Sequence, residues 1–163
     1  MRTLGIDPGT TVTGWGIVEA HGNYLRHVAH GTIRTQAASP LPERLTEIFR
    51  GLCGVIHQHQ PEVAAIESIF LAHNVQSAMK LGHARGAAIV AASQSGLAVH
   101  EYAALEVKKS VVGYGRAEKH QVQEMVRVLL GMGQVAPADA ADALAVALCH
   151  VHQSTSPRHR LHP

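Results

Sequence analysis

Only three aspartates occur in this 163-residue chain, and each interrupts an apolar segment. Asp7 ends an apolar run typical of a buried strand, whereas Asp139 and Asp142 lie in an alanine-rich segment that predicts a helix. A fourth carboxylate, Glu67, ends a second apolar strand. Carboxylates in apolar elements are costly to desolvate unless they are paired, and a divalent cation can pair with several at once. The pattern therefore predicts a fold that gathers these acids around metal in an enzyme.

The apolar periodicity predicts an α/β fold, because strands and helices alternate along most of the chain. The first three strands are joined by short glycine-containing turns, which favours an antiparallel meander, and the later strand–helix–strand order favours parallel crossovers. The predicted strands are Thr3–Asp7, Thr13–Glu19, Tyr24–Ile33, Val63–Glu67 and Leu97–Tyr102, and the predicted helices are 42–60, Asn74–Ser95, Leu105–Val112, Glu118–Leu130 and Pro137–Val151.

The length predicts a single domain, spanning residues 1–152, followed by a flexible basic tail, residues 153–163. The formal net charge is only +2, but positive charge is concentrated between Lys80 and Arg127. This stretch contains seven Lys and Arg residues and four Glu. A basic surface beside an acidic pocket suits a polyanion whose phosphate must reach a metal.

The two cysteines, Cys53 and Cys149, are far apart and form no paired motif, which favours a reducing, cytoplasmic setting. We expect no signal peptide, because Asp7 interrupts the apolar N-terminus, and no membrane span, because the longest apolar run is far shorter than the roughly 20 residues required. The thirteen histidines raise the question of zinc. Neighbouring histidines such as His150 and His152 do not face each other on a helix, so we interpret them as mostly surface residues rather than zinc ligands.

Several motifs resemble the RuvC Holliday junction resolvase family, collinearly from about Leu4 to His152. They are Gly5-Ile6-Asp7-Pro8-Gly9-Thr10, Thr13-Gly14-Trp15-Gly16, Ala65-Ile66-Glu67-Ser68-Ile69-Phe70, Lys80-Leu81-Gly82-His83-Ala84-Arg85-Gly86, Glu101-Tyr102-Ala103, Val107-Lys108-Lys109-Ser110-Val111-Val112-Gly113 and Ala138-Asp139-Ala140-Ala141-Asp142-Ala143-Leu144.

The resemblance implies an RNase H-like fold, with a mixed five-stranded sheet and helices on both faces. It implies a homodimeric, Mg²⁺-dependent endodeoxyribonuclease that resolves Holliday junctions in homologous recombination and DNA repair. Paired nicks in opposing strands would leave 5′-phosphate and 3′-hydroxyl ends, in partnership with the RuvA–RuvB branch-migration complex. By position, the two Mg²⁺ ions, which Mn²⁺ can replace, would be held by Asp7, Glu67, Asp139 and Asp142.

Other residues are candidates for holding the four-way junction. Phe70 follows the Glu67 strand and could stack on an unpaired base, although most phenylalanines are core residues. Basic side chains could contact phosphates, although scattered lysines often form only a solvated face. These candidates are Lys80, Arg85, Lys108, Lys109, Arg116, Lys119 and His120.

Two alternatives stay open from the residues alone. Actin-like ATPases and sugar kinases also begin with a Gly-Ile-Asp-x-Gly-Thr-Thr strand and hairpin, but they need two lobes and a second phosphate-binding hairpin. A structure-specific DNA-binding protein without catalysis would keep the basic stretch but has no need for four converging acids. For a dimer, the predicted helix with Gly82 and Gly86 is the candidate interface, and ordinary packing within one chain is the other interpretation.

Overall fold

A computed structural model describes residues 1–68 and 75–155. Its strands are β1 (Arg2–Asp7), β2 (Val12–His21), β3 (Tyr24–Arg34), β4 (Val63–Glu67) and β5 (Ala98–Tyr102). Its helices are α1 (Leu41–His59), α2 (Val75–Gln94), α3 (Ala104–Val112), α4 (Lys119–Leu129) and α5 (Ala138–Thr155). The predicted elements are all present, and most of their ends agree within two residues.

The five strands form one mixed sheet in the order β3-β2-β1-β4-β5. The first three strands form the predicted antiparallel meander, whereas β4 and β5 run parallel to β1. Parallel pairing of β1 with β4 brings the carboxyl ends of both strands to one edge of the sheet. Asp7 and Glu67 are the last residues of these strands, so the fold places both acids at that edge.

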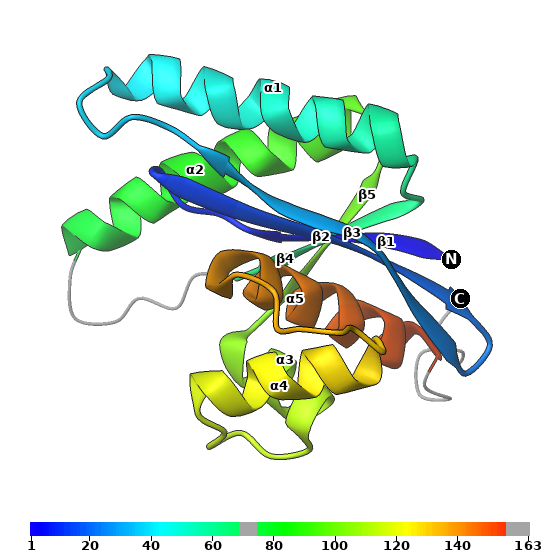
Figure 1. The fold of residues 1–163 in the computed structure, drawn as a ribbon. Coiled ribbons are helices and arrows are strands. Elements are labelled where there is room, and N and C mark those ends of the chain that lie inside the picture. The colour runs from blue at the N-terminus through cyan, green and yellow to red at the C-terminus, as the bar shows by residue number, and fades with distance from the viewer. Residues whose placement is uncertain (69–74, 156–163) are drawn as a thin grey trace, which may run out of the picture.

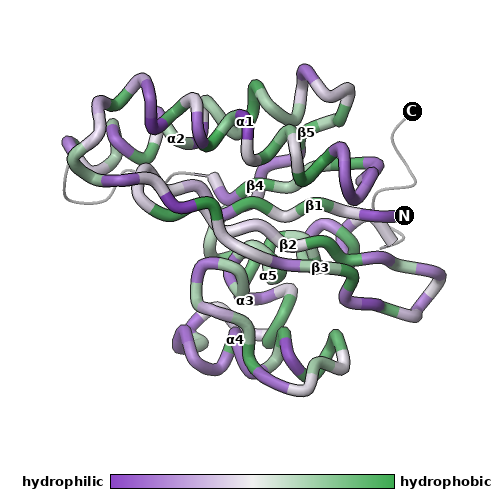
Figure 2. The backbone as a smooth tube through the Cα atoms, turned by 45° about the horizontal axis from the view of Figure 1, so that its top comes forward, coloured by the Kyte–Doolittle hydropathy of each residue, from purple (hydrophilic) through white to green (hydrophobic). Residues whose placement is uncertain are grey.

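Helices cover both faces of the sheet, as Figure 1 shows, with α1 and α2 on one side and α5 on the other. On the first side, Leu4, Ile6 and Ile66 pack with apolar residues of α1 and α2 in one core cluster. On the second side, α5 lies between the sheet and the pair α3 and α4, which form an outer layer. Figure 2 shows apolar colour through the middle strands and α5 and hydrophilic colour on the outer turns of the helices. The prediction of helices on both faces is therefore confirmed.

The first turns of α5 lie directly on the backbone of β1 and β2. A Cβ atom on Gly5 would overlap the carbonyl oxygen of Ala143, and a Cβ on Gly14 would overlap that of Asp139. Glycine is needed at these two positions because only a residue without a side chain lets the helix approach so closely. This contact carries the aspartates of α5 over the strand that ends in Asp7.

The structure departs from the sequence prediction in two places. Helix α5 continues to Thr155, so residues 153–155 are helical rather than part of a flexible tail. His150 is buried, which corrects its interpretation as a surface residue, because α5 is enclosed between the sheet and two outer helices.

Gly82 and Gly86 are exposed on α2, and no atom of the described residues lies close to where a Cβ would stand. The close approach predicted for these glycines is therefore not made within the described chain. In the same ranges, no helix has the length and apolar character needed to cross a membrane.

Candidate active site

Four carboxylates from three elements lie near one another at this edge of the sheet. Asp7 and Glu67 come from the strand ends, and Asp139 and Asp142 come from the first and second turns of α5. All four side chains are partly buried. A tight turn follows Asp7, in which the Thr13 hydroxyl donates to the carbonyl oxygen of Gly9 at 2.8 Å. This turn ends β1 at Asp7 and fixes the direction in which the carboxylate leaves the sheet.

The electrostatics show that these acids are close enough to repel one another. Burial raises the pKa of Asp7 from 3.8 to about 7, and the charges of Asp142, Glu67 and Asp139 each contribute to the rise. Burial also raises the pKa of Glu67, again with help from Asp142. Like charges held together in a poorly solvated place favour the protonated form, and a bound cation would relieve that cost.

Lys119, the first residue of α4, brings its ammonium group against one of these acids. Its Nζ lies 2.8 Å from Oδ2 of Asp142. That hydrogen bond raises the pKa of Lys119, and the lysine charge in turn lowers the pKa of Asp7 and of Glu67. The lysine therefore neutralises part of the negative charge in the absence of metal.

Two cavities meet at Glu67. One, of about 260 Å³, is lined by Asp7, Glu67 and Arg85, together with Ser68 and Leu81. The second, of about 200 Å³, is lined by Glu67, Asp142, Lys108 and Lys119. Lys108 also lowers the pKa of Glu67 through its charge. The site thus has acids at its base and basic side chains on its walls, an arrangement suited to a phosphodiester.

The donor set suits a hard divalent cation, because Mg²⁺ prefers carboxylate oxygens and keeps several waters of its own. Within residues 1–68 and 75–155, however, no three acidic, histidine or cysteine side chains are already placed as a coordination cluster. The raised pKa values indicate that the acids lie near one another, but their side chains are not arranged as a complete set of metal ligands. Metal binding would require rotations of the carboxylate side chains and the release of Asp142 by Lys119.

The predicted DNA-contacting residues fall into three groups. Lys108 and Lys119 line the site, and Arg85 lines its first cavity while forming an ion pair with Glu101. The others are exposed and lie outside both cavities: Lys80 on α2, Lys109 on α3, Arg116 between α3 and α4, and His120 on α4. Phe70 lies outside the described residues.

Sequence reasoning missed two features of this site. It did not predict that Lys119 pairs with Asp142, because the two residues lie on different helices. It also did not predict that Ser68, Leu81 and Ala104 line the first cavity. For Leu81 the adjacent Lys80-Leu81-Gly82 motif was a signal, but the direction of its side chain depends on how α2 is placed.

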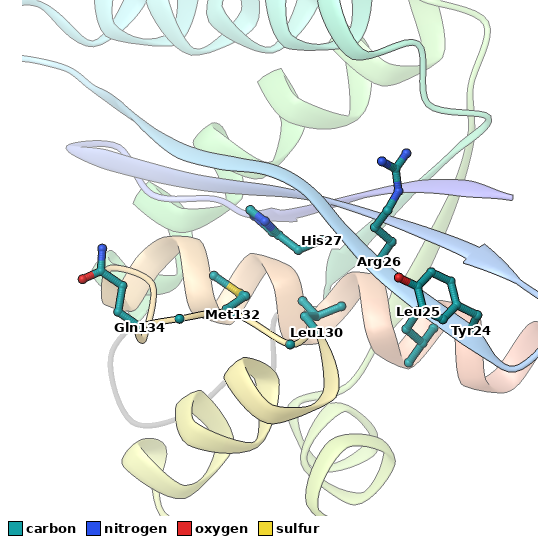
Figure 3. A pocket seen from close by; sticks show the side chains of 9 residues that line it. Tyr24, Leu25, Arg26, His27, Leu130, Met132 and Gln134 are labelled. Atoms are coloured by element: carbon teal, nitrogen blue, oxygen red, sulfur yellow. The ribbon is translucent and has the colours of Figure 1, made fainter.

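A more voluminous hollow than either of these two cavities lies elsewhere. It has a volume of about 590 Å³ and is formed by the first residues of β3 and the segment that connects α4 to α5. Figure 3 shows Tyr24, Leu25, Arg26 and His27 on one side and Leu130, Met132 and Gln134 on the other. No carboxylate lines it, so the acids and the strand ends identify the smaller cavities as the site.

Comparison with known proteins agrees with this geometry. Residues 3–150 match the family model described as crossover junction endodeoxyribonuclease RuvC. A relative of that name from Citrifermentans bemidjiense is 59% identical over 154 residues, which cover 94% of each chain. The Thermus thermophilus RuvC solved in complex with a Holliday junction substrate superposes with a TM-score of 0.89 at 36% identity, covering 95% of each chain.

A more distant structure shows the fold alone. The yeast mitochondrial Holliday junction resolvase Ydc2 superposes with a TM-score of 0.68 at 11% identity, over 97% of this chain and 81% of that one. The match to the RuvC family model, by contrast, extends over nearly the whole chain and includes all four carboxylates of the site. The chain belongs to the crossover junction endodeoxyribonuclease RuvC family, whose fold is RNase H-like.

Proposed function

We propose that this protein is a structure-specific endonuclease that resolves Holliday junctions by symmetric, metal-dependent nicks, leaving 5′-phosphate and 3′-hydroxyl ends. The observation that carries the proposal is the set of mutually repelling carboxylates at the carboxyl edge of β1 and β4 and the start of α5. Such a cluster destabilises the fold unless it binds cations. Nuclease activity, as in this family, would account for its presence.

Metal dependence belongs to the family, and for this chain we propose two Mg²⁺ ions, with Mn²⁺ able to replace them. Asp7, Glu67, Asp139 and Asp142 would hold them. When bound, such a pair of ions can activate a water molecule and neutralise charge on the phosphate and the leaving oxygen. The protein contributes the positions of the four carboxylates and a partly dry cavity that strengthens their interaction with cations.

The basic residues of the site would act on the DNA backbone. Lys119 now pairs with Asp142, and once a cation neutralises that carboxylate its ammonium group is free to contact a phosphate. Lys108, on the wall of the same cavity, is placed to do so from α3. Lys80, Lys109, Arg116 and His120 are proposed to hold the junction arms farther out, Arg85 is proposed to contact the strand beside the site, and Phe70 is proposed to stack on a base near the cut.

The paired nicks require two sites, and we propose a homodimer that presents one site to each of two opposing strands. Helix α2 offers the surface for it. Val75, Met79 and Val90 are exposed apolar residues on this helix, with exposed fractions of 71%, 61% and 47%. Together with the exposed Gly82 and Gly86, which lie between Met79 and Val90, they follow one another at spacings of three and four residues, so all five share one face. A second copy packing on this face would cover both the apolar side chains and the glycines.

The family match also supports a proposal for the compartment and the partners of the enzyme. We propose that it works in the cytoplasm with the RuvA–RuvB branch-migration complex, which would move the junction to a site of cleavage. We further propose that residues 1–152 form one nuclease domain. The two described cysteines are not joined to each other, which fits a reducing compartment.

A nicking assay on a synthetic four-way junction tests the proposal against both alternatives. The nuclease should cut two opposing strands in Mg²⁺ or Mn²⁺, spare linear duplex of the same sequence, and do nothing in EDTA. A DNA-binding protein without catalysis would retard the junction and leave its strands intact. An actin-like ATPase would hydrolyse ATP and ignore the junction.

A further inference from the structure

We propose that the hydrogen bond between Tyr102 and His150 is a positioning device that sets where α5 stands along the sheet, and so holds the two aspartates of α5 opposite those of the strand ends. The inference rests on the metal site of the proposed function. It assigns a role to two buried polar residues that lie outside both cavities of that site.

The contact between the first turns of α5 and the sheet is nearly smooth. Gly5 and Gly14 present bare backbone to the backbone of Ala143 and Asp139. The helix residues around these points, from Ala138 to Ala145, are alanines apart from two aspartates and Leu144. Close backbone packing sets the distance between helix and sheet, and Leu144 is the large side chain of this stretch that lies against the sheet, at Gly16. The position along the helix axis therefore depends also on contacts farther along α5.

Farther along α5, Leu148 and Val151 pack in the core, and the Tyr102–His150 contact adds a directional constraint to that packing. The Tyr102 hydroxyl and Nδ1 of His150 are 2.7 Å apart, and both residues are buried, with exposed fractions of 7% and 5%. A hydrogen bond is directional, so this one is satisfied at a single position of α5. Sliding the helix by one turn, about 5.4 Å, would separate the two atoms and leave two buried polar groups unpaired, which is costly.

Both ends of this bond are connected to the site. Tyr102 lies beside Glu67 in the parallel pairing of β4 with β5, and its carbonyl oxygen accepts a hydrogen bond of 2.8 Å from the backbone N–H of Ser68. His150 follows Asp142 by eight residues on the same helix, or about 12 Å along its axis. The bond therefore relates the strand that ends in Glu67 to the helix that carries Asp142.

Neighbouring contacts hold the histidine in place. The ring of His100, on β5, stacks against that of His150 with 4.6 Å between ring centres. Two residues further along α5, Nδ1 of His152 lies 3.2 Å from the hydroxyl oxygen and 3.0 Å from the carbonyl oxygen of Ser110 on α3. The end of α5 is thus tied both to the strand beside Glu67 and to the helix that carries Lys108. Neither Tyr102 nor His150 would touch metal or DNA, so both are positioning residues.

Metal binding by Tyr102→Phe, which removes only the hydroxyl, tests this inference without relying on activity. The matched control is Tyr24→Phe, because Tyr24 is 65% exposed. Mn²⁺ binding is measured from the loss of the free-ion electron paramagnetic resonance signal, and junction binding is measured in EDTA. We expect Tyr102→Phe to weaken Mn²⁺ binding and to raise the Mg²⁺ midpoint for cleavage by about three- to tenfold. Saturating Mg²⁺ should restore the rate, and junction affinity should match that of the wild type and of Tyr24→Phe.

Unchanged Mn²⁺ affinity and Mg²⁺ midpoint in Tyr102→Phe would overturn the inference, whatever happens to its melting temperature. Should that variant not fold, the pair His150→Asn and His150→Leu decides in the same way. Asparagine can keep a polar atom near the place of Nδ1, so His150→Asn should bind Mn²⁺ more tightly than His150→Leu. Equal Mn²⁺ affinities of the two variants would count against the positioning role of His150. If the wild-type protein shows no Mn²⁺ binding that is lost in Asp7→Asn, the proposed function and this inference are overturned together.

Discussion

The ammonium group of Lys119 on α4 lies 2.8 Å from a carboxylate oxygen of Asp142 on α5, a residue more than twenty positions later in the chain. The lysine charge offsets part of the repulsion among the acids. Under the proposed function, metal and Lys119 would compete for Asp142, and a DNA phosphate would offer the displaced ammonium group a new partner.

Replacing this lysine should separate metal affinity from catalysis. In Lys119→Gln we expect tighter binding of Mg²⁺, because a competing positive charge is gone, and a single-turnover cleavage rate at least about tenfold lower, because a phosphate contact is lost. Lys80→Gln, which removes the same charge from the exposed surface of α2, should weaken junction binding and leave the Mg²⁺ midpoint unchanged. Equal effects of both substitutions on the Mg²⁺ midpoint would show that the Asp142 contact is irrelevant.

Asp7 should make the stability of the metal-free protein depend on pH. Its pKa is 3.8 in the unfolded chain and about 7 when folded, so the folded protein binds more protons between these values. The stability contributed by protonated Asp7 is fully present below pH 3.8 and is lost as the pH rises through 7. Asp7→Asn removes this loss, and at pH 8 in EDTA it should be more stable than the wild type by about 1 to 3 kcal/mol.

Urea unfolding at pH 5 and pH 8 measures this difference, which should grow with pH and shrink when Mg²⁺ is added to the wild type. The same variant should bind the junction and fail to cut it. If Asp7→Asn is the less stable protein at pH 8 without metal, the carboxylate is not under the repulsion described above.

Gly14 should be intolerant of even one methyl group. A Cβ at this position would overlap the carbonyl group of Asp139, so Gly14→Ala has to push the first turn of α5 away from the sheet. We expect a loss of about 2 to 4 kcal/mol in the free energy of unfolding and loss of cleavage. The control is Gly54→Ala in α1, where no atom lies near the added carbon and alanine favours the helix by about 0.5 to 1 kcal/mol. Calorimetry measures the stability of the two variants, and the nicking assay measures their cleavage. If the two variants behaved alike in both, the close contact between Gly14 and Asp139 would be contradicted.

The α2 face should decide the oligomeric state. Met79→Glu places a charge in the proposed dimer interface, and we expect sedimentation to show dissociation into monomers at concentrations where the wild type is a dimer. Val128→Glu, on the exposed surface of α4, is the matched control because Val128 is 55% exposed and Met79 is 61% exposed. A Met79→Glu protein that remains dimeric would place the interface elsewhere.

Local patterns in the sequence were sufficient to predict most of the fold. Apolar runs ending in Asp7 and Glu67 predicted buried strands, and the parallel pairing of β1 with β4 confirms that their ends meet. Pro137 marked the start of α5 correctly, but its end was placed too early, because the contact of His152 with Ser110 involves a residue distant in the chain.

The acids of the candidate site and three of its basic residues could be named from the sequence, but their contacts could not. The cost of the acids in apolar elements can be read from the chain, whereas the partners of Lys119 and His150 depend on how helices pack. His150 was assigned to the surface because helical spacing alone cannot show that a third layer covers α5. Tertiary packing, rather than local pattern, decides such contacts.

Crystals of the protein with junction DNA, grown or soaked in Mn²⁺ and measured at the manganese absorption edge, test the central claim most directly. The account predicts two anomalous peaks within coordination distance of Asp7, Glu67, Asp139 and Asp142, with Lys119 moved from Asp142 toward a phosphate, and no such peaks in Asp7→Asn. Ordered DNA at the site with manganese absent from these four carboxylates, or bound only at histidines elsewhere, would contradict it.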